Sequence, residues 1–204
     1  MRPDLEVVAN MVPAGSRVLD LGCGDGALLA HLIAERGCEG YGIEIDGDDV
    51  LACITAGVPV TQGDIEDALR DFADDAFDVV LLSWTLQTTR RPAAVVAGMM
   101  RVAPVGVVSF PNFAHWRLRA ALALRGRMPL SRTLPQAWHE TPNIHMCTLA
   151  DFEALAASLD LHVSERVLLG GTRGRAGTAA AALPNLFAAA AVYRLERTPG
   201  KPAE

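Results

Sequence analysis

The sequence predicts an α/β fold, a doubly wound and mostly parallel sheet with helices on both faces. The first observation is that short apolar runs alternate with segments that carry apolar residues at helical spacing. The second is a glycine-rich turn, Gly22-Cys23-Gly24-Asp25-Gly26, between the first such run and the first such segment. The third is size, because 204 residues, 50% of them hydrophobic, fit one compact domain.

The amino-terminal half supplies four expected strands. The first run ends at the glycines, and apolar residues at helical spacing follow over 27–33, which indicates strand, turn and helix. The pattern returns with a strand, a helix over 48–56, a third strand and a run that is apolar enough to be buried on both faces. The strands expected here are residues 18–21, 40–45, 58–62 and 77–83.

The carboxyl-terminal half continues the alternation. A helix over 92–102 starts with proline, as helices often do, and one over 149–159 starts with a capping pair. The last expected strand is unusual, because its Ala-rich sequence by itself favours a helix. We assign a strand there, because together with the preceding strand it would form a hairpin like the one that ends such sheets. The loop between the two strands, 170–182, is expected to be flexible. The strands expected here are residues 105–110, 161–169 and 186–195.

Residues 115–145 break the alternation. They hold five arginines, three prolines and two tryptophans without a clear strand. We therefore expect an insertion, or lid, after the fifth strand and over the carboxyl edge of the sheet. Its arginines either bind an acidic partner or carboxylate substrate, or form a solvated helix face. The expected organisation is a single domain over 1–198 with a tail over 199–204.

Charge and cysteine content exclude several classes of function. A net charge of −6 gives no general attraction to nucleic acid or anionic membranes. No apolar run is long enough to span a bilayer, and acids stand near the start where a secretory signal would be apolar, so we expect a cytoplasmic protein. The cysteines show no zinc-ligand spacing and are expected to be reduced, without a metal: Cys23, Cys38, Cys53 and Cys147.

The glycine turn indicates a nucleotide-type ligand, because glycines let a ligand approach the backbone closely. Gly22, Gly24 and Ala27 satisfy the loose dinucleotide pattern. Asp20 and Asp25 oppose that interpretation, since two like charges about 4 Å apart repel by roughly 4 kcal/mol at an effective dielectric constant near 20. S-adenosylmethionine lacks phosphate and carries an ammonium and a sulfonium, which such acids would stabilise. The alternative is a glycine turn whose acids only cap a helix.

Further acids follow the second and third strands. Glu44 stands 18 residues after Gly26, close to the spacing of an acid that accepts hydrogen bonds from ribose hydroxyls. Asp46 is more simply a turn or cap residue. In Gly63-Asp64-Ile65, Asp64 could accept from an adenine amine while Ile65 packs on the ring, although Asp64 alone would be an ordinary turn residue. Three acids at the ends of three successive strands are more specific than any one of them.

These residues resemble the class I S-adenosylmethionine-dependent methyltransferases in motif and in order, which implies a Rossmann-like seven-stranded sheet. The similarity to one family on this fold, the MetW proteins of methionine biosynthesis, is closer. It rests on blocks at residues 2–6, 19–26, 41–46, 109–116, 125–129 and 141–148, among them Ser109-Phe110-Pro111-Asn112-Phe113-Ala114-His115-Trp116 and Thr141-Pro142-Asn143-Ile144-His145-Met146-Cys147-Thr148.

The resemblance implies S-adenosylmethionine or S-adenosylhomocysteine as ligand and a homoserine O-acyltransferase, acetyl- or succinyltransferase, as partner. The alternative is a methyltransferase acting on a small-molecule hydroxyl, carboxyl or amine, while a nicotinamide-dependent oxidoreductase is disfavoured by the acids. The expected ligand-binding residues are Asp20, Gly22, Cys23, Gly24, Gly26, Glu44, Ile45, Gly63, Asp64, Ile65 and Ser83.

Four further side chains are open to two interpretations each. His115 is the best-placed base if methyl transfer occurs, with His139 and His145 behind it, although each histidine could be purely structural. Trp84, at the end of the fourth strand, could cover the sulfonium or seal the core.

Overall fold

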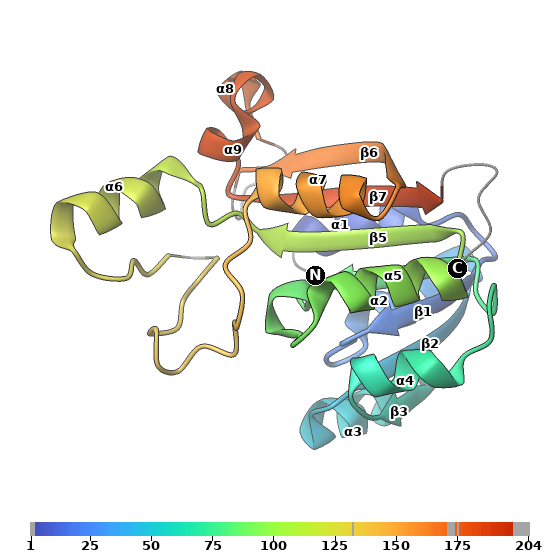
Figure 1. The fold of residues 1–204 in the computed structure, drawn as a ribbon. Coiled ribbons are helices and arrows are strands. Elements are labelled where there is room, and N and C mark those ends of the chain that lie inside the picture. The colour runs from blue at the N-terminus through green and yellow to red at the C-terminus, as the bar shows by residue number, and fades with distance from the viewer. Residues whose placement is uncertain (1–2, 132, 171–173, 175, 198–204) are drawn as a thin grey trace.

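A computed structural model describes residues 3–131, 133–170, 174 and 176–197. It contains one seven-stranded sheet with the order β3-β2-β1-β4-β5-β7-β6 (Figure 1). Neighbours among β1 to β5 pair in parallel, and β7 is antiparallel to both β5 and β6. The predicted fold is therefore confirmed. The strands are β1 (Arg17–Leu21), β2 (Glu39–Glu44), β3 (Val60–Gln62), β4 (Val79–Ser83), β5 (Val105–Pro111), β6 (Leu161–Leu169) and β7 (Ala190–Arg197).

Helices cover both faces of the sheet, as Figure 1 shows, with α4, α5 and α7 on one face and α1 and α2 on the other. The central strand β4 is apolar because each of its faces meets one of these layers: Val80 and Leu82 pack with α5 and α7, whereas Val79 and Leu81 pack with α1 and α2. The helices are α1 (Pro3–Met11), α2 (Ala27–Arg36), α3 (Gly47–Thr55), α4 (Ile65–Asp71), α5 (Pro92–Val102), α6 (Trp116–Arg125), α7 (Leu149–Ser158), α8 (Thr178–Ala182) and α9 (Pro184–Phe187), with a 3₁₀ turn η1 (Leu86–Thr88).

The last two strands form the predicted hairpin, although its boundaries differ from expectation. Burial overrides the helical propensity of the Ala-rich sequence, because Tyr193 of β7 is fully buried and stacks on Phe110 with ring centroids 5.7 Å apart. The expected strand begins too early, since α9 occupies the residues before Ala190. The predicted loop over 170–182 is wrong at its end, which forms α8. Residues 171–173 and 175 lie outside the described residues, as does the expected tail over 199–204.

Besides α8 and α9, three helices were not predicted. Helix α1 packs its apolar side on the sheet, and Arg194 Nη1 of β7 donates to the carbonyl of Met11 at its end over 2.7 Å. Helix α4 follows directly on Asp64. Helix α6 lies in the expected insertion, where it ends at Gly126 in the left-handed region (φ 62°). Across the described ranges, no helix is long and apolar enough to cross a membrane.

Candidate functional site

A cleft of about 440 Å³ opens at the carboxyl edge of the sheet. It lies where β1, β2, β3 and β4 end, which is the place where open α/β sheets bind ligands, and its volume lies in the range of small-molecule sites. The residues that line it are Gly22, Glu44, Ile45, Asp49, Gly63, Asp64, Ile65, Glu66, Trp84, Thr85, Thr88, Thr89, Arg90 and Pro142.

The glycine turn after β1 forms the first wall of this cleft. Gly22 and Gly24 both adopt left-handed backbone conformations, with φ of 73° and 56°. A Cβ on Gly22 would lie 2.6 Å from Thr85 Oγ1, so a side chain there would collide with the opposite wall. A Cβ on Gly24 would meet nothing within 4 Å. The turn is thus closely packed at its first glycine and open at its second.

Glu44 at the end of β2 is buried and holds three backbone amides. Its Oε2 accepts from Gly24 N at 2.8 Å, and its Oε1 accepts from Ile45 N at 2.7 Å and from Asp46 N at 3.0 Å. A carboxylate has room for about four such bonds. Glu44 therefore fixes the glycine turn and the turn after β2, and it retains capacity for a further donor.

Asp64, which follows β3, has both of its carboxylate oxygens engaged. Oδ1 accepts from Glu66 N at 2.8 Å and caps α4, while Oδ2 pairs with Arg90 Nη2 at 2.7 Å. Asp46 caps α3 in the same way, accepting from Asp48 N and Asp49 N. The helix-cap role that was an alternative for Asp46 is present in the structure. Asp64, for which the alternative was an ordinary turn residue, also caps a helix, and it lines the cleft.

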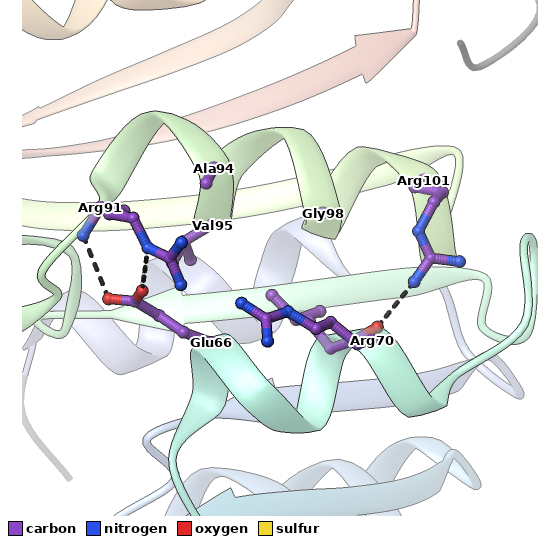
Figure 2. A pocket seen from close by; sticks show the side chains of 8 residues that line it. Glu66, Arg70, Arg91, Ala94, Val95, Gly98 and Arg101 are labelled. Atoms are coloured by element: carbon purple, nitrogen blue, oxygen red, sulfur yellow. Dashed lines mark hydrogen bonds and ion pairs between the residues drawn. The ribbon is translucent and has the colours of Figure 1, made fainter.

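Glu66 joins α4 to the start of α5 and was not anticipated from the sequence. Its Oε1 accepts from Arg90 N at 2.7 Å and Arg91 N at 3.1 Å, and its Oε2 accepts from Arg91 Nε at 2.8 Å. Figure 2 shows these two side chains turned toward each other at one end of a small hollow between the helices. The hydrogen bond from Arg91 lowers the pKa of Glu66 despite its burial.

Carboxylates outnumber cations around the cleft. Glu44, Asp49, Asp64 and Glu66 line it. Asp64 is paired with Arg90 and Glu66 with Arg91, so the excess negative charge comes from Glu44 and Asp49. Burial, followed by repulsion from Glu44 and neighbouring aspartates, raises the pKa of Asp49. The cleft therefore favours a cationic ligand over an anionic one.

Five of the predicted ligand-binding residues support the wall of the cleft and do not line it: Asp20, Cys23, Gly24, Gly26 and Ser83. Asp20 is buried within β1, and the Cys23 thiol faces that of Cys53 on α3, with 3.8 Å between the sulfurs. Burial raises the pKa of Cys23. Ser83 Oγ lies 2.9 Å from Ser109 Oγ of the neighbouring strand. The other six predicted residues line the cleft: Gly22, Glu44, Ile45, Gly63, Asp64 and Ile65.

His115 serves as the amino-terminal cap of α6. Its Nδ1 accepts from Arg117 N over 3.3 Å, so that nitrogen carries no proton in this arrangement. Burial, with a smaller contribution from the charge of Arg117, lowers the pKa of His115. Among the described residues that line the cleft there is no histidine.

The far wall of the cleft comes from residues that were not predicted to bind the ligand, although Pro142 belongs to the 141–148 block. Thr85, Thr88 and Thr89 follow β4, and Pro142 belongs to the returning part of the insertion. That part is held beside the cleft by the Gln87 carbonyl, which accepts from the backbone N–H groups of residues 144 and 145 at 2.8 and 3.0 Å.

Trp84 lies between the cleft and the core, so its role in sealing the core is present, while its contact with a sulfonium stays a prediction. It lines the cleft and packs against the buried cluster on the α1 side of the sheet. Its φ of 59° is in the left-handed region, which costs a bulky residue energy. The Gln87 side chain donates from Nε2 to the Trp84 carbonyl at 2.8 Å and so supports this turn.

Comparison with curated proteins connects the chain to methionine biosynthesis. The family model described as "Methionine biosynthesis protein MetW" matches residues 2–195. The "Bifunctional methionine biosynthesis protein MetXA/MetW" of Rhodopirellula baltica is 35% identical over 181 residues, which are 84% of this chain and 29% of that protein. A "Ubiquinone biosynthesis O-methyltransferase" of Pseudomonas entomophila is 32% identical over 134 residues, 62% of this chain and 57% of that protein. The chain thus spans less than two thirds of the length of either relative.

Solved structures agree on the fold. An S-adenosylmethionine-dependent methyltransferase from Archaeoglobus fulgidus superposes with a TM-score of 0.69 at 15% identity, covering 95% of this chain and 91% of that one. Another from Mesorhizobium loti gives 0.69 at 18% identity, covering 96% and 98%. Together with the family match, these likenesses show that the chain has the class I methyltransferase fold and belongs to the MetW family of methionine biosynthesis proteins.

Proposed function

We propose that the cleft binds S-adenosylmethionine or S-adenosylhomocysteine. The observation that carries this proposal is the set of carboxylates, Glu44, Asp49, Asp64 and Glu66, around a cleft with one paired arginine. A dinucleotide would bring a pyrophosphate into this negative field, whereas an adenosyl ligand brings an ammonium and, in S-adenosylmethionine, a sulfonium. The residues present therefore fit the adenosyl ligand.

Each wall of the cleft has a proposed part in binding. Glu44 accepts from the ribose hydroxyls, for which it retains acceptor capacity. Asp64 accepts from the adenine amine, while Ile45 and Ile65 pack on the adenine ring. Gly22 lines the cleft without a side chain, so the ligand can approach the backbone there. When bound, S-adenosylmethionine supplies a methyl group activated by a positively charged sulfur.

Residues behind the wall have a positioning role in this account. Asp20 is buried at the end of β1, next to the glycine turn, which Cys23 and Gly26 help to shape through their packing. Ser83 joins β4 to β5 through Ser109. His115 is assigned no step, because it caps α6 and does not line the cleft.

We further propose that the chain serves methionine biosynthesis together with a homoserine O-acyltransferase, acetyl- or succinyltransferase. The MetW resemblance implies this partner, and a relative whose name joins MetXA and MetW in one chain supports it. Fusion of two proteins is one way to hold partners at a high effective concentration. We place this role in the cytoplasm, since free and scattered thiols fit a reducing compartment.

A pull-down from native cell extract tests the proposed partnership. The tagged chain is recovered, and mass spectrometry identifies both the captured protein and any small molecule released on denaturation. We expect a homoserine O-acyltransferase together with an adenosyl ligand. Recovery of the adenosyl ligand without the acyltransferase, repeated with purified proteins, would contradict the partnership and leave ligand binding intact.

The second candidate function is methyl transfer to a small-molecule hydroxyl, carboxyl or amine. The similarity over 134 residues to proteins described as ubiquinone biosynthesis O-methyltransferases favours it. Turnover of labelled S-adenosylmethionine with panels of hydroxy acids, phenols and amines tests it. Acceptor-dependent transfer that needs no acyltransferase would favour this function over the first.

A further inference from the structure

Exposed apolar side chains concentrate in one segment of the molecule. Of the twelve large hydrophobic side chains that are exposed in the described part of the chain, eight lie between Trp116 and Met146. The most exposed of these eight side chains are Leu124 at 86%, Trp138 at 74% and Leu130 at 63%. We call the exposed side chains of residues 116–146 the insertion face. An apolar concentration of this kind on a folded protein marks an interaction site.

The insertion face stands away from the domain. Figure 1 shows α6 and the chain after it projecting beyond the carboxyl end of β5, clear of the sheet and its helices. Its base is nevertheless fastened. Asn112, which is buried, donates from Nδ2 to the Ala188 carbonyl at 2.8 Å and accepts from Ala114 N at 2.9 Å. The returning part is held at Gln87. A fastened base presents this surface without a large ordering cost on binding.

The segment is basic within an acidic chain. Between residues 115 and 146 there are five arginines and one glutamate, a balance of +4. The remaining residues carry 13 basic and 23 acidic side chains, a balance of −10, which together with +4 gives the net charge of −6. Arg117 also lies over the Trp116 ring, 5.4 Å from its centroid. Tryptophan and arginine are enriched among the residues that carry interface energy.

Two other occupants fit this surface less well. A symmetric pair of copies would place the same patch against itself, so two surfaces that each have a charge balance of +4 would meet and repel. A membrane would need one apolar stripe along α6, but at about 100° per residue Leu124 and Leu122 project roughly 80° and 240° around the helix from Trp116. Apolar side chains on several sides of a helix fit a concave protein surface.

We propose that the insertion face is the surface through which this chain docks on its homoserine O-acyltransferase, at a hollow that is apolar and bordered by carboxylates. The inference rests on the partnership proposed above and adds its location. Of the described residues of this segment, Pro142 lines the cleft. A partner docked on the insertion face would therefore lie beside the cleft, whose walls would still be formed by this chain.

Isothermal titration calorimetry tests the location of the docking surface. The purified full chain is titrated with the purified homoserine O-acyltransferase of the same organism. One variant combines Leu124→Ser with Trp138→Ser, and another combines Arg125→Glu with Arg127→Glu. Each variant should lower the affinity for the acyltransferase by at least about tenfold, since apolar and arginine side chains at the centre of an interface cost the most binding energy when removed. The matched control combines Leu51→Ser with Ile54→Ser on α3, whose side chains are 62% and 61% exposed, and should change affinity by less than about twofold. S-adenosylhomocysteine affinity is measured on every preparation and should stay unchanged.

The outcomes separate this inference from the proposed function. If the unaltered chain binds the acyltransferase and both variants bind it equally well, the location is wrong while the partnership stands. If the unaltered chain does not bind the acyltransferase, the partnership fails, and the inference fails with it. If a variant loses S-adenosylhomocysteine binding but still binds the acyltransferase, the location is wrong and the segment is a lid over the cleft. Self-association of the unaltered chain that the Leu124 and Trp138 variant abolishes would assign the face to a second copy. Binding of the unaltered chain to phosphatidylglycerol vesicles that this variant abolishes would assign the face to a membrane.

Discussion

The side chain of Glu44 accepts a hydrogen bond from the backbone N–H of Gly24, with 2.8 Å between Oε2 and the nitrogen. This bond joins the end of β2 to the glycine turn after β1, two segments 20 residues apart in the sequence. The same carboxylate accepts from the two amides that follow it. The position of one side chain therefore sets the shape of two walls of the cleft.

Replacement of Glu44 by alanine should weaken adenosyl-ligand binding by about 1.5 to 3 kcal/mol, the range for hydrogen bonds to a charged group. The fold should persist, because the sheet does not depend on this side chain. Calorimetry with S-adenosylhomocysteine measures the effect, and Glu39→Ala, at the exposed start of the same strand, is the matched control. An unchanged dissociation constant in a folded Glu44→Ala protein would remove the ribose role.

Asp64→Ala should cost less ligand affinity than Glu44→Ala, because water can replace part of a single adenine amine contact. It should also cost stability, about 1 to 2 kcal/mol, since the α4 cap and the Arg90 pair are both lost. Thermal unfolding and calorimetry on the same preparations separate the two effects. A larger loss of ligand affinity for Asp64→Ala than for Glu44→Ala would reverse their assigned importance.

The first two glycines of the turn, Gly22 and Gly24, should respond differently to replacement by alanine. Gly24→Ala carries only the backbone cost of its positive φ, about 1 to 2 kcal/mol. Gly22→Ala adds the collision with Thr85 and should cost about 2 to 5 kcal/mol. Adding Thr85→Ala should recover part of that loss, because the two nearest atoms disappear and only Cβ at 3.2 Å remains. Equal destabilisation by the two single substitutions, in chemical denaturation, would show that the packing of the first glycine does not matter.

Glu66 should make stability depend on pH in the acid range. Its pKa is lowered in the folded protein, so its contribution is present above the ordinary glutamate pKa, near 4.5, and is lost as the pH falls through the lower folded value. Glu66→Gln should therefore reduce the free energy of unfolding by about 1 to 2 kcal/mol at pH 7, and by progressively less below pH 4.5. The exposed Glu35 on α2 provides the control Glu35→Gln. A difference from wild type that does not shrink on acidification would argue against the ion pair as its cause.

Much of the fold could be predicted because it depends on local patterns. The buried strand β4 and the Thr148–Asp151 capping box of α7 have signatures a few residues long. Helices α4 and α6 were missed for different reasons. Asp64 followed by Glu66 is a capping pattern that would have indicated α4, had the acid not been considered only as a ligand or turn residue. Helix α6 has apolar and basic residues without a single buried stripe, so it lacks the period on which prediction depends.

The candidate site was predictable on one side only. Residues that follow β1, β2 and β3 were identifiable because the carboxyl ends of parallel strands meet at one edge. The opposite wall depends on hydrogen bonds between distant segments, such as those that Gln87 accepts from residues 144 and 145, and these leave no local signal. Cys23 shows the converse, since motif membership placed it at the ligand whereas its thiol packs against Cys53.

Calorimetric titration of the purified chain with S-adenosylhomocysteine, S-adenosylmethionine and NAD tests the central claim most directly. The claim is that an acidic cleft at the strand ends takes an adenosyl ligand that carries an ammonium group and no phosphate. We predict saturable one-to-one binding of the two adenosyl ligands and much weaker binding of NAD, with Glu44→Ala reducing the former. Tighter binding of NAD than of either adenosyl ligand would contradict the account.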